Sequence, residues 1–236
     1  MSHLRDVLIE NYAEHYLRVN RGNKSRNCGW MPLRWTQLID ELPPASKVLD
    51  LGCGTGYVLE WLSGHPNVIP IGIDASPTQV AIARAALPDI EISCGDGLDY
   101  LKRHTNEFAA ILCNDVLEHI PGDDLCLEWV QTARAALKPG GFFACKTPNA
   151  GNLLGCYGRY MDLTHVRSFT STSMQQLLEA GGLESCETMP MHARHLRGWL
   201  RLRVETMIHR VIYRIFGRYE PVVTKNVCGV GLRRAA

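Results

Sequence analysis

Asp115, Glu118 and His119 are spaced i, i+3 and i+4 after a strand-like run, so on a helix they would share one face. His165 follows the next strand-like run, and such strand ends are neighbours in a doubly wound sheet. Two carboxylates and two imidazoles are a reasonable ligand set for Mg²⁺, Mn²⁺ or Fe²⁺. The spacing therefore predicts a divalent-metal site made of these four residues.

The same residues also have explanations without a metal. Asp115 can cap a helix, Glu118 can pair with an arginine, and His119 can pack under a loop. His119 or His165 would then be the candidate general base of a reaction. Both interpretations stay open, because a coordination set is recognised by its geometry and not by spacing.

A glycine-rich turn, DLGCGTG at residues 50–56, follows the first strand-like run. Such a turn lets backbone N–H groups and a helix N-terminus come close to a bound cofactor. A dinucleotide fingerprint needs a third glycine three residues after the second, and Tyr57 stands at that position instead. The pattern therefore argues against a dinucleotide.

Acidic residues also follow the second and third strand-like runs, at Asp74 and Asp96. A carboxylate at this edge can accept hydrogen bonds from two vicinal ribose hydroxyls. Each aspartate alone could be a helix cap or a turn residue. Three acidic turns at one edge, with Asp50 as the first, indicate a shared ligand site.

Short apolar runs that alternate with helical patterns would position these residues. The expected strands cover residues 47–51, 68–73, 90–93, 108–113 and 141–146, and the helices between them 58–64, 77–87 and 123–137. Continuously apolar runs are typical of strands that helices cover on both faces. The order predicts an α/β fold with a doubly wound, mostly parallel sheet.

A single domain with four parts is expected from the length of 236 residues. The parts are a cap of two helices (1–45, the second helix around 31–42), a cofactor-binding core (46–190), a basic amphipathic insert (191–218) and a last strand (219–236). The nine scattered cysteines without a CxxC pair are typical of a reducing compartment. No apolar run reaches the roughly 20 residues that span a bilayer. We therefore expect a cytoplasmic protein.

Five motifs occur in order along the chain: KVLDLGCGTGYVLEWL, GIDAS, CGDGLDYL, FAAILCNDVLEHI and LKPGGFFACKTPN. Together they resemble the motifs of class I, Rossmann-like S-adenosylmethionine-dependent methyltransferases, over about residues 46–190. The resemblance implies a seven-stranded sheet whose last strand is antiparallel. It also implies S-adenosylmethionine as the cofactor, which has no pyrophosphate.

The resemblance further assigns the cofactor contacts. The loop glycines would lie against the methionine moiety, Asp74 on the ribose, and Asp96 with Gly97 at the adenine, while Asn114 would face the sulfonium. The full cofactor-binding set that it implies is Asp50, Gly52, Gly54, Gly56, Asp74, Ala75, Asp96, Gly97 and Asn114.

The predicted metal cluster resembles two metal-using branches of this class, the ubiquinone-pathway O-methyltransferases and the small-RNA terminal 2′-O-methyltransferases. These have E-x-x-E-H and a later histidine, whereas Asp115 here is one methylene shorter than Glu. A sulfonium methyl group is already activated, so the enzyme mainly aligns the acceptor. A hydroxyl acceptor must also lose a proton, which a histidine base or a divalent cation can assist. The cluster therefore favours O-methylation.

The THVRSFT stretch at 164–170 and the basic insert resemble methyltransferases of bacterial polysaccharide and natural-product clusters. We therefore expect a sugar or glycan-type hydroxyl as the acceptor, with a lipid-linked acceptor as one form of it. The alternatives are a phenolic or quinone-like small molecule, and a protein that binds S-adenosylmethionine without turnover. The oligomeric state stays open.

Residues 192–218 combine basic charge with an apolar stripe at helical spacing. Seven arginines stand against one acid, Glu205, at positions 194, 197, 201, 203, 210, 214 and 218. The stripe consists of Leu200, Val204, Met207, Ile208, Val211, Ile212 and Ile215. It could pack on the sheet as core, or lie on an anionic membrane with Trp199 and Phe216 near the interface. We favour membrane or a lipid-linked acceptor over nucleic acid, because arginine alternates here with large aliphatic residues.

Overall fold

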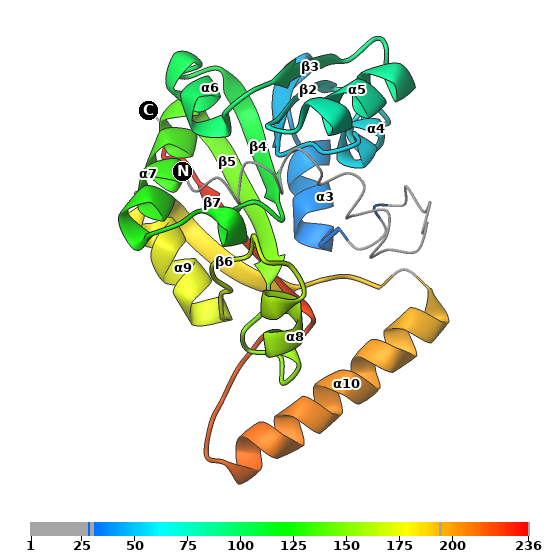
Figure 1. Cartoon of the computed structure of the whole chain (residues 1–236), viewed down its shortest axis with the longest axis vertical. Coiled ribbons are helices and arrows are strands. Elements are labelled where there is room, and N and C mark those ends of the chain that lie inside the picture. The colour runs from blue at the N-terminus through cyan, green and yellow to red at the C-terminus, as the bar shows by residue number, and fades with distance from the viewer. Residues whose placement is uncertain (1–27, 29–30, 194, 236) are drawn as a thin grey trace.

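A single seven-stranded sheet forms the centre of the computed structural model, which describes residues 28, 31–193 and 195–235 (Figure 1). The strands are β1 (Ser46–Leu51), β2 (Val68–Asp74), β3 (Glu91–Cys94), β4 (Phe108–Asn114), β5 (Leu137–Pro148), β6 (Glu184–Pro190) and β7 (Asn226–Leu232). Their order in the sheet is β3-β2-β1-β4-β5-β7-β6. Strand β7 is antiparallel to both β5 and β6, and the pairs between β3 and β5 are parallel. The predicted doubly wound sheet with an antiparallel last strand is confirmed.

Helices cover both faces of the sheet. They are α3 (Leu33–Asp40), α4 (Tyr57–Leu62), α5 (Pro77–Ala86), α6 (Gly97–Arg103), α7 (Asp123–Ala136), α8 (Gly155–Tyr160), α9 (Ser171–Ala180) and α10 (Leu196–Ile215), with a 3-10 turn η1 (Leu117–His119). One core cluster joins α3, α4 and α5 to the sheet, and the other joins α6, α7 and α9. Helix α3 corresponds to the second predicted helix of the cap, and the first lies outside the described residues. The division into four parts stays a prediction.

The central strands are buried on both sides because their residues alternate between the two core clusters. In β1, Leu49 belongs to the cluster under α6, α7 and α9, and Val48 to the cluster under α3, α4 and α5. Phe143 and Phe142 of β5 divide in the same way. This alternation explains why the runs are continuously apolar and not amphipathic.

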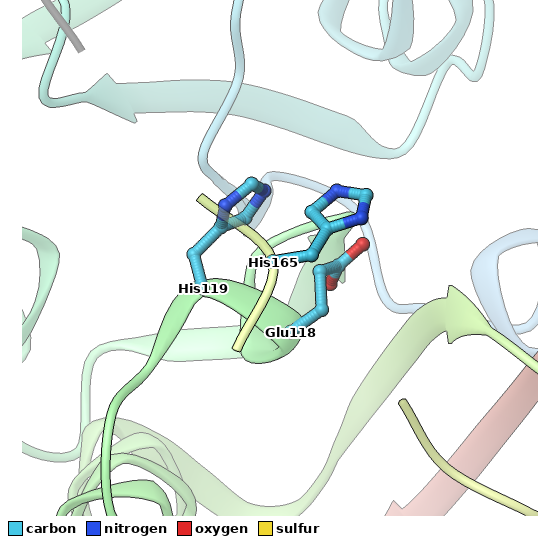
Figure 2. Close-up of side chains that lie close together, drawn as sticks. All are labelled: Glu118, His119 and His165. Atoms are coloured by element: carbon cyan, nitrogen blue, oxygen red, sulfur yellow. The ribbon is translucent and has the colours of Figure 1, made fainter. Parts of the chain in front are cut away.

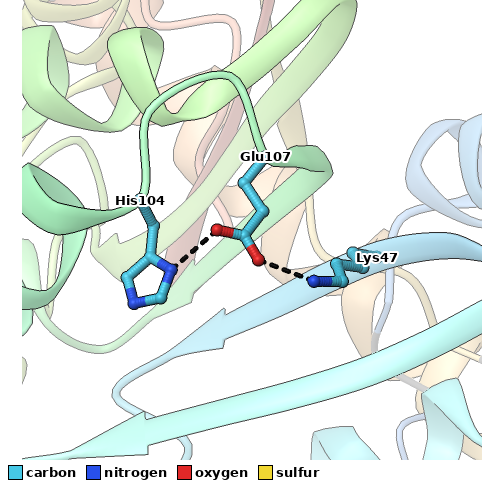
Figure 3. Close-up of polar contacts among 3 residues, drawn as sticks. All are labelled: Lys47, His104 and Glu107. Atoms are coloured by element: carbon cyan, nitrogen blue, oxygen red, sulfur yellow. Dashed lines mark hydrogen bonds and ion pairs between the residues drawn. The ribbon is translucent and has the colours of Figure 1, made fainter.

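A polar cluster joins neighbouring elements at the amino edge of the sheet, where β1 and β4 begin (Figure 3). The Glu107 carboxylate accepts a hydrogen bond from Lys47 Nζ at 2.7 Å and lies 2.7 Å from Nδ1 of His104. The hydrogen bonds from Lys47 and His104 hold the pKa of Glu107 below its usual value. This cluster lies at the edge opposite the residues that the sequence singles out for chemistry.

The two remaining helices, α8 and α10, lie beyond the sheet at the end toward which the parallel strands point (Figure 1). All nine cysteines lie in the described part of the chain, and all are free thiols. In the same part of the chain, no helix has both the length and the apolar character needed to cross a membrane.

Candidate active site

The glycine-rich loop turns the chain from β1 into α4 at the carboxyl edge of the sheet. Gly52, Gly54 and Gly56 have φ angles of 83°, 53° and 85°, in a region of backbone conformation that residues other than glycine rarely adopt. The backbone N–H groups of Gly52 and Cys53 both donate to the carbonyl oxygen of Ile73, at 2.8 and 3.0 Å. The loop is thus fixed to the end of β2.

The Asp74 carboxylate at the end of β2 holds the same loop. Its two oxygens accept hydrogen bonds from the backbone N–H groups of Gly54, at 2.9 Å, and Ser76, at 2.8 Å. Burial raises the pKa of Asp74, and these two hydrogen bonds oppose the rise. Ala75 is exposed beside it. Asp74 therefore orders the loop in addition to any contact it makes with a ribose.

Asp50 and Asn114 carry buried polar atoms that have no hydrogen-bond partner among the described residues. Asp50 is the last residue but one of β1 and Asn114 is the last of the adjacent strand β4, and they are only 1% and 6% exposed. Burial, followed by the charge of Asp74, raises the pKa of Asp50 to about 8. Buried polar groups are normally paired, so this arrangement fits a polar ligand with a cationic group, such as the amino acid moiety of S-adenosylmethionine.

Asp96 and Gly97 follow β3 and begin α6. The Asp96 carboxylate caps the helix by accepting a hydrogen bond from the backbone N–H of Asp99 at 2.9 Å. A Cβ on Gly97 would approach the Trp129 ring to 2.7 Å and Leu51 to 2.9 Å, so only glycine fits there. Each residue thus has a structural role at the carboxyl edge, where the resemblance places the adenine.

Asp115 does not share a helix with Glu118 and His119, so the predicted helix that would carry all three is wrong. Asp115 has a left-handed φ of 55°, and only the short η1 turn, Leu117–His119, follows it. Its carboxylate accepts a hydrogen bond from Nζ of Lys146, whose side chain is 6% exposed. The backbone N–H of Asp115 also donates to the carbonyl oxygen of Lys146 at 2.9 Å. Asp115 is therefore turned toward β5.

The other three predicted ligands lie close together (Figure 2). One ligand atom from each of Glu118, His119 and His165 can be chosen so that all three lie within 4.8 Å of one another. The η1 turn supplies the first two, and the loop between α8 and α9 supplies His165. The backbone N–H of Val166 joins the two segments by donating to the carbonyl oxygen of Glu118 at 2.8 Å.

The Nδ1 atom of each imidazole has a hydrogen-bond partner. His165 Nδ1 lies 2.9 Å from the carbonyl oxygen of Gly158, which can only accept, so Nδ1 carries the proton. Thr164 Oγ1 donates to the Asp162 carboxylate at 2.7 Å and therefore accepts from His119 Nδ1 at 2.8 Å. His165 is thereby left with a lone pair on Nε2, which is the arrangement that metal-ligating histidines have.

Burial governs the electrostatics of this cluster. It raises the pKa of Glu118, which is fully buried and has no hydrogen-bond partner for either carboxylate oxygen among the described residues; the charge of Asp115 adds to the rise. Burial, followed by the neighbouring His165, lowers the pKa of His119 to about 4. A neutral imidazole and a buried, partnerless carboxylate together fit a divalent cation.

The two halves of the site adjoin at the carboxyl edge. A Cβ on Gly52 of the glycine-rich loop would approach Cγ2 of Val116 to 2.3 Å, so the loop lies directly against the segment between Asp115 and η1. The sequence reasoning missed Lys146, Thr164 and Asp162 as supporting residues. A lysine in an otherwise apolar strand, and an Asp two residues before a Thr-His pair, were the signals that could have found them.

A family model described as a methyltransferase domain matches residues 25–188 of this chain. The match covers well over half of the chain and includes both halves of the site.

Two relatives are named ubiquinone biosynthesis O-methyltransferase. The one from Thiobacillus denitrificans is 29% identical over 194 residues, which cover 75% of this chain and 81% of the relative. The one from Coxiella burnetii is 30% identical over 123 residues, so that the chain spans about 50% of its length. Among solved structures, a SAM-dependent methyltransferase from Archaeoglobus fulgidus superposes with a TM-score of 0.68 at 18% identity, covering 94% of this chain and 99% of that one. At that identity the likeness shows the fold alone.

Proposed function

Because the chain belongs to the methyltransferase domain family and is a class I S-adenosylmethionine-dependent methyltransferase, we propose that it methylates a hydroxyl oxygen. The observation that carries this proposal is the group formed by Glu118, His119 and His165 next to the glycine-rich loop. An alcohol must lose its proton to be methylated, whereas an amine already offers a lone pair. A site with two imidazoles and a buried carboxylate meets that requirement.

Glu118, His119 and His165 would hold a divalent cation, with Mg²⁺, Mn²⁺ and Fe²⁺ as the candidates. Such a cation would supply Lewis acidity to a hydroxyl of the acceptor. The hydrogen bonds of Nδ1 to Thr164 in His119 and to Gly158 in His165 would leave Nε2 as the candidate ligand atom of each ring. Asp115, one of the four predicted ligands, pairs with Lys146, and we do not propose it as a ligand of the cation.

The alternative without a metal is that one of the two histidines acts as the general base. With a pKa of about 4, His119 is a weak base at neutral pH. His165 is then the candidate that accepts the proton of the acceptor hydroxyl through Nε2, because its Nδ1 proton is donated to the Gly158 carbonyl.

For the acceptor we propose a sugar or glycan-type hydroxyl, free or lipid-linked, used at the cytoplasmic face of a membrane. The 164–170 stretch and the basic helix α10 support it. A phenolic or quinone-like acceptor is the second candidate, and the names of the Thiobacillus denitrificans and Coxiella burnetii relatives favour it. Both classes offer adjacent oxygens that a divalent cation could chelate.

Formation of S-adenosylhomocysteine from S-adenosylmethionine tests the proposal directly. The purified chain is incubated with catechols, with sugar diols and with primary amines, with and without added Mg²⁺ or Mn²⁺. Turnover with a hydroxyl acceptor is expected, and it should be lost in Glu118→Gln. The matched control is Glu107→Gln, the same chemical change at the opposite edge of the sheet. Turnover with amines alone would contradict O-methylation, and no turnover with any acceptor would favour a binding protein.

A further inference from the structure

Helix α10 is amphipathic, but its apolar face points to solvent, whereas an ordinary surface helix turns that face toward the core. Most of the apolar stripe predicted from the sequence faces solvent, together with Leu196: six apolar residues on this side are each at least 50% exposed, whereas Ile208 is 48% exposed and Ile212 is partly buried. The six residues are Leu196, Leu200, Val204, Met207, Val211 and Ile215. The possibility that the stripe packs on the sheet is thereby excluded for these six. Large exposed apolar surfaces mark binding sites for proteins, membranes or ligands.

The opposite side of α10 attaches the helix to the rest of the chain. Glu205, His209 and Tyr213 are spaced i, i+4 and i+8 and contact the segment that follows β5. The Glu205 carboxylate accepts a hydrogen bond from Asn152 Nδ2 at 3.0 Å, and His209 Nε2 accepts one from the backbone N–H of Leu153 at 3.0 Å. Tyr213 donates its hydroxyl hydrogen to the carbonyl oxygen of Gly151 at 2.8 Å. These polar contacts hold α10 with its apolar stripe pointing outward.

Basic side chains border the apolar stripe on both sides. By helical periodicity, Arg203, Arg210 and Arg214 flank one side, and Arg197 and Arg201 flank the other. All five are exposed, and none forms an ion pair with a described residue. Glu205 is the single acid of the helix, and it faces the protein. The outward surface is therefore apolar along its middle and positive along both margins.

We propose that α10 lies on an anionic lipid bilayer, with its apolar stripe at the level of the acyl chains and its arginines among the phosphate headgroups. An apolar stripe between basic margins is the pattern of an interfacial helix. Trp199 lies in the first turns of the helix, with the Arg203 guanidinium 4.8 Å from its ring centroid, and Phe216 follows the last helical residue and is 75% exposed. Aromatic rings at both ends suit the boundary between headgroups and acyl chains.

Exposed apolar side chains also occur in and around α8. Leu154, Tyr157, Tyr160 and Leu163 are each at least 70% exposed, in the segment that α10 contacts through Leu153. The same segment carries Gly158, whose carbonyl oxygen accepts the hydrogen bond from His165. Helices α8 and α10 lie at the same end of the molecule, beyond the carboxyl edge (Figure 1). A bilayer beneath α10 would thus bring a lipid-linked acceptor to the active site; this consequence rests on the proposed function.

Vesicle flotation with the full chain tests membrane binding without any need for activity. Phosphatidylglycerol-containing vesicles and pure phosphatidylcholine vesicles are compared at low and high salt. We expect binding to the anionic vesicles only, and less of it at high salt. In Arg203→Glu/Arg210→Glu, the loss of two basic contacts should by itself lower partitioning into anionic vesicles about 30-fold, since each contributes about 1 kcal/mol. Val204→Asp/Val211→Asp should also reduce binding, because it places charge in the stripe.

The control is Arg103→Glu/Lys138→Glu, which changes the net charge by the same amount at the amino edge and should leave flotation unchanged. S-adenosylmethionine calorimetry on each variant verifies that it is folded. Absence of binding by the unmodified chain to anionic vesicles overturns the proposal. So does retention on duplex DNA or RNA that the arginine variant loses and the valine variant keeps, because it identifies a nucleic acid as the partner. A dimer that the valine variant dissociates, without vesicle binding, identifies a second copy instead.

Discussion

Lys146, on strand β5, donates a hydrogen bond to the Asp115 carboxylate. This contact turns Asp115 away from the cluster of Glu118, His119 and His165. The lysine is buried at the end of β5, and although burial by itself lowers the pKa of its amine, the Asp115 carboxylate raises it above its usual value. Lys146 therefore stays charged, and the Asp115 carboxylate forms an ion pair with it. The pair joins β5 to the turn that precedes Glu118.

Asp115→Asn should destabilise the fold more than an exposed substitution does. The amide tolerates the left-handed backbone, but the buried ammonium of Lys146 loses its counter-charge. We expect a loss of about 1–3 kcal/mol in the free energy of unfolding, below the range for fully buried pairs because Asp115 is partly exposed. Denaturant unfolding of Asp115→Asn, Lys146→Met and the double variant gives the coupling; additive effects would show that the pair is not coupled.

Divalent-metal affinity should depend on Glu118 and His165, and little on Asp115. Exhaustive chelation is expected to remove activity, and Mg²⁺ or Mn²⁺ to restore it. By calorimetry, Glu118→Gln should abolish metal binding, while Asp115→Asn should keep it within about tenfold of the unmodified chain, as for a change outside the ligands. Full activity after chelation would assign Glu118 and the histidines to acid–base or structural roles.

Thr164→Val tests how the His119 ring is oriented. The hydroxyl of Thr164 links His119 Nδ1 to Asp162, and valine keeps the shape without the link. Loss of such an outer partner usually costs about 10- to 100-fold in metal affinity. An unchanged affinity, with the protein folded, would mean that Nε2 of His119 is not a ligand.

Asp74→Ala should weaken S-adenosylmethionine binding about 10- to 150-fold, the equivalent of one charged hydrogen bond. The substitution removes the acceptor expected for the ribose and also the contact that orders Gly54. Gly54→Val should abolish binding, because φ at this position is 53° and a Cβ would meet Gln79 at 2.8 Å. Calorimetry checks both, with Glu107→Gln as the control that should bind normally. Unchanged affinity in folded Asp74→Ala and Gly54→Val would refute the cofactor assignment.

The unliganded protein should become less stable as pH rises from about 4 to about 8. Asp50 has a folded-state pKa of about 8, above the ordinary aspartate pKa of 3.8, so folding favours the protonated carboxyl, and its ionisation at higher pH destabilises the fold. Asp50→Asn should reduce this dependence, to which Asp74 and Glu118 with their raised pKa values still contribute. It should also stabilise the unliganded protein by about 1–3 kcal/mol at the upper end of the range, less than the full linkage value because the amide also needs partners.

The same variant should bind S-adenosylmethionine more weakly, because the ligand's cationic group loses the carboxylate. Denaturant unfolding at several pH values, with and without the cofactor, checks both effects. A pH dependence that Asp50→Asn leaves unchanged would assign the titration to another group.

The sequence by itself determined the sheet and the cofactor loop. Alternating apolar runs and helix patterns place most elements within a few residues of their observed bounds, as with the predicted strand at 108–113 and the observed Phe108–Asn114. The positive φ angles of Gly52, Gly54 and Gly56 need glycine, and so the spacing alone reveals that turn. These features depend on neighbours in the chain, and local sequence therefore carries them.

Only the tertiary structure decided which side chains meet. Asp115 stands three residues before Glu118, but a left-handed residue and a 3-10 turn replace the expected helix, and Lys146, 31 residues further on, takes its carboxylate. The side of α10 that faces solvent also depends on distant partners, namely Gly151, Asn152 and Leu153. Helical spacing shows that an apolar stripe exists, but contacts between segments far apart in the chain determine whether it faces the core or the solvent, because each hydrogen bond needs both partners in place.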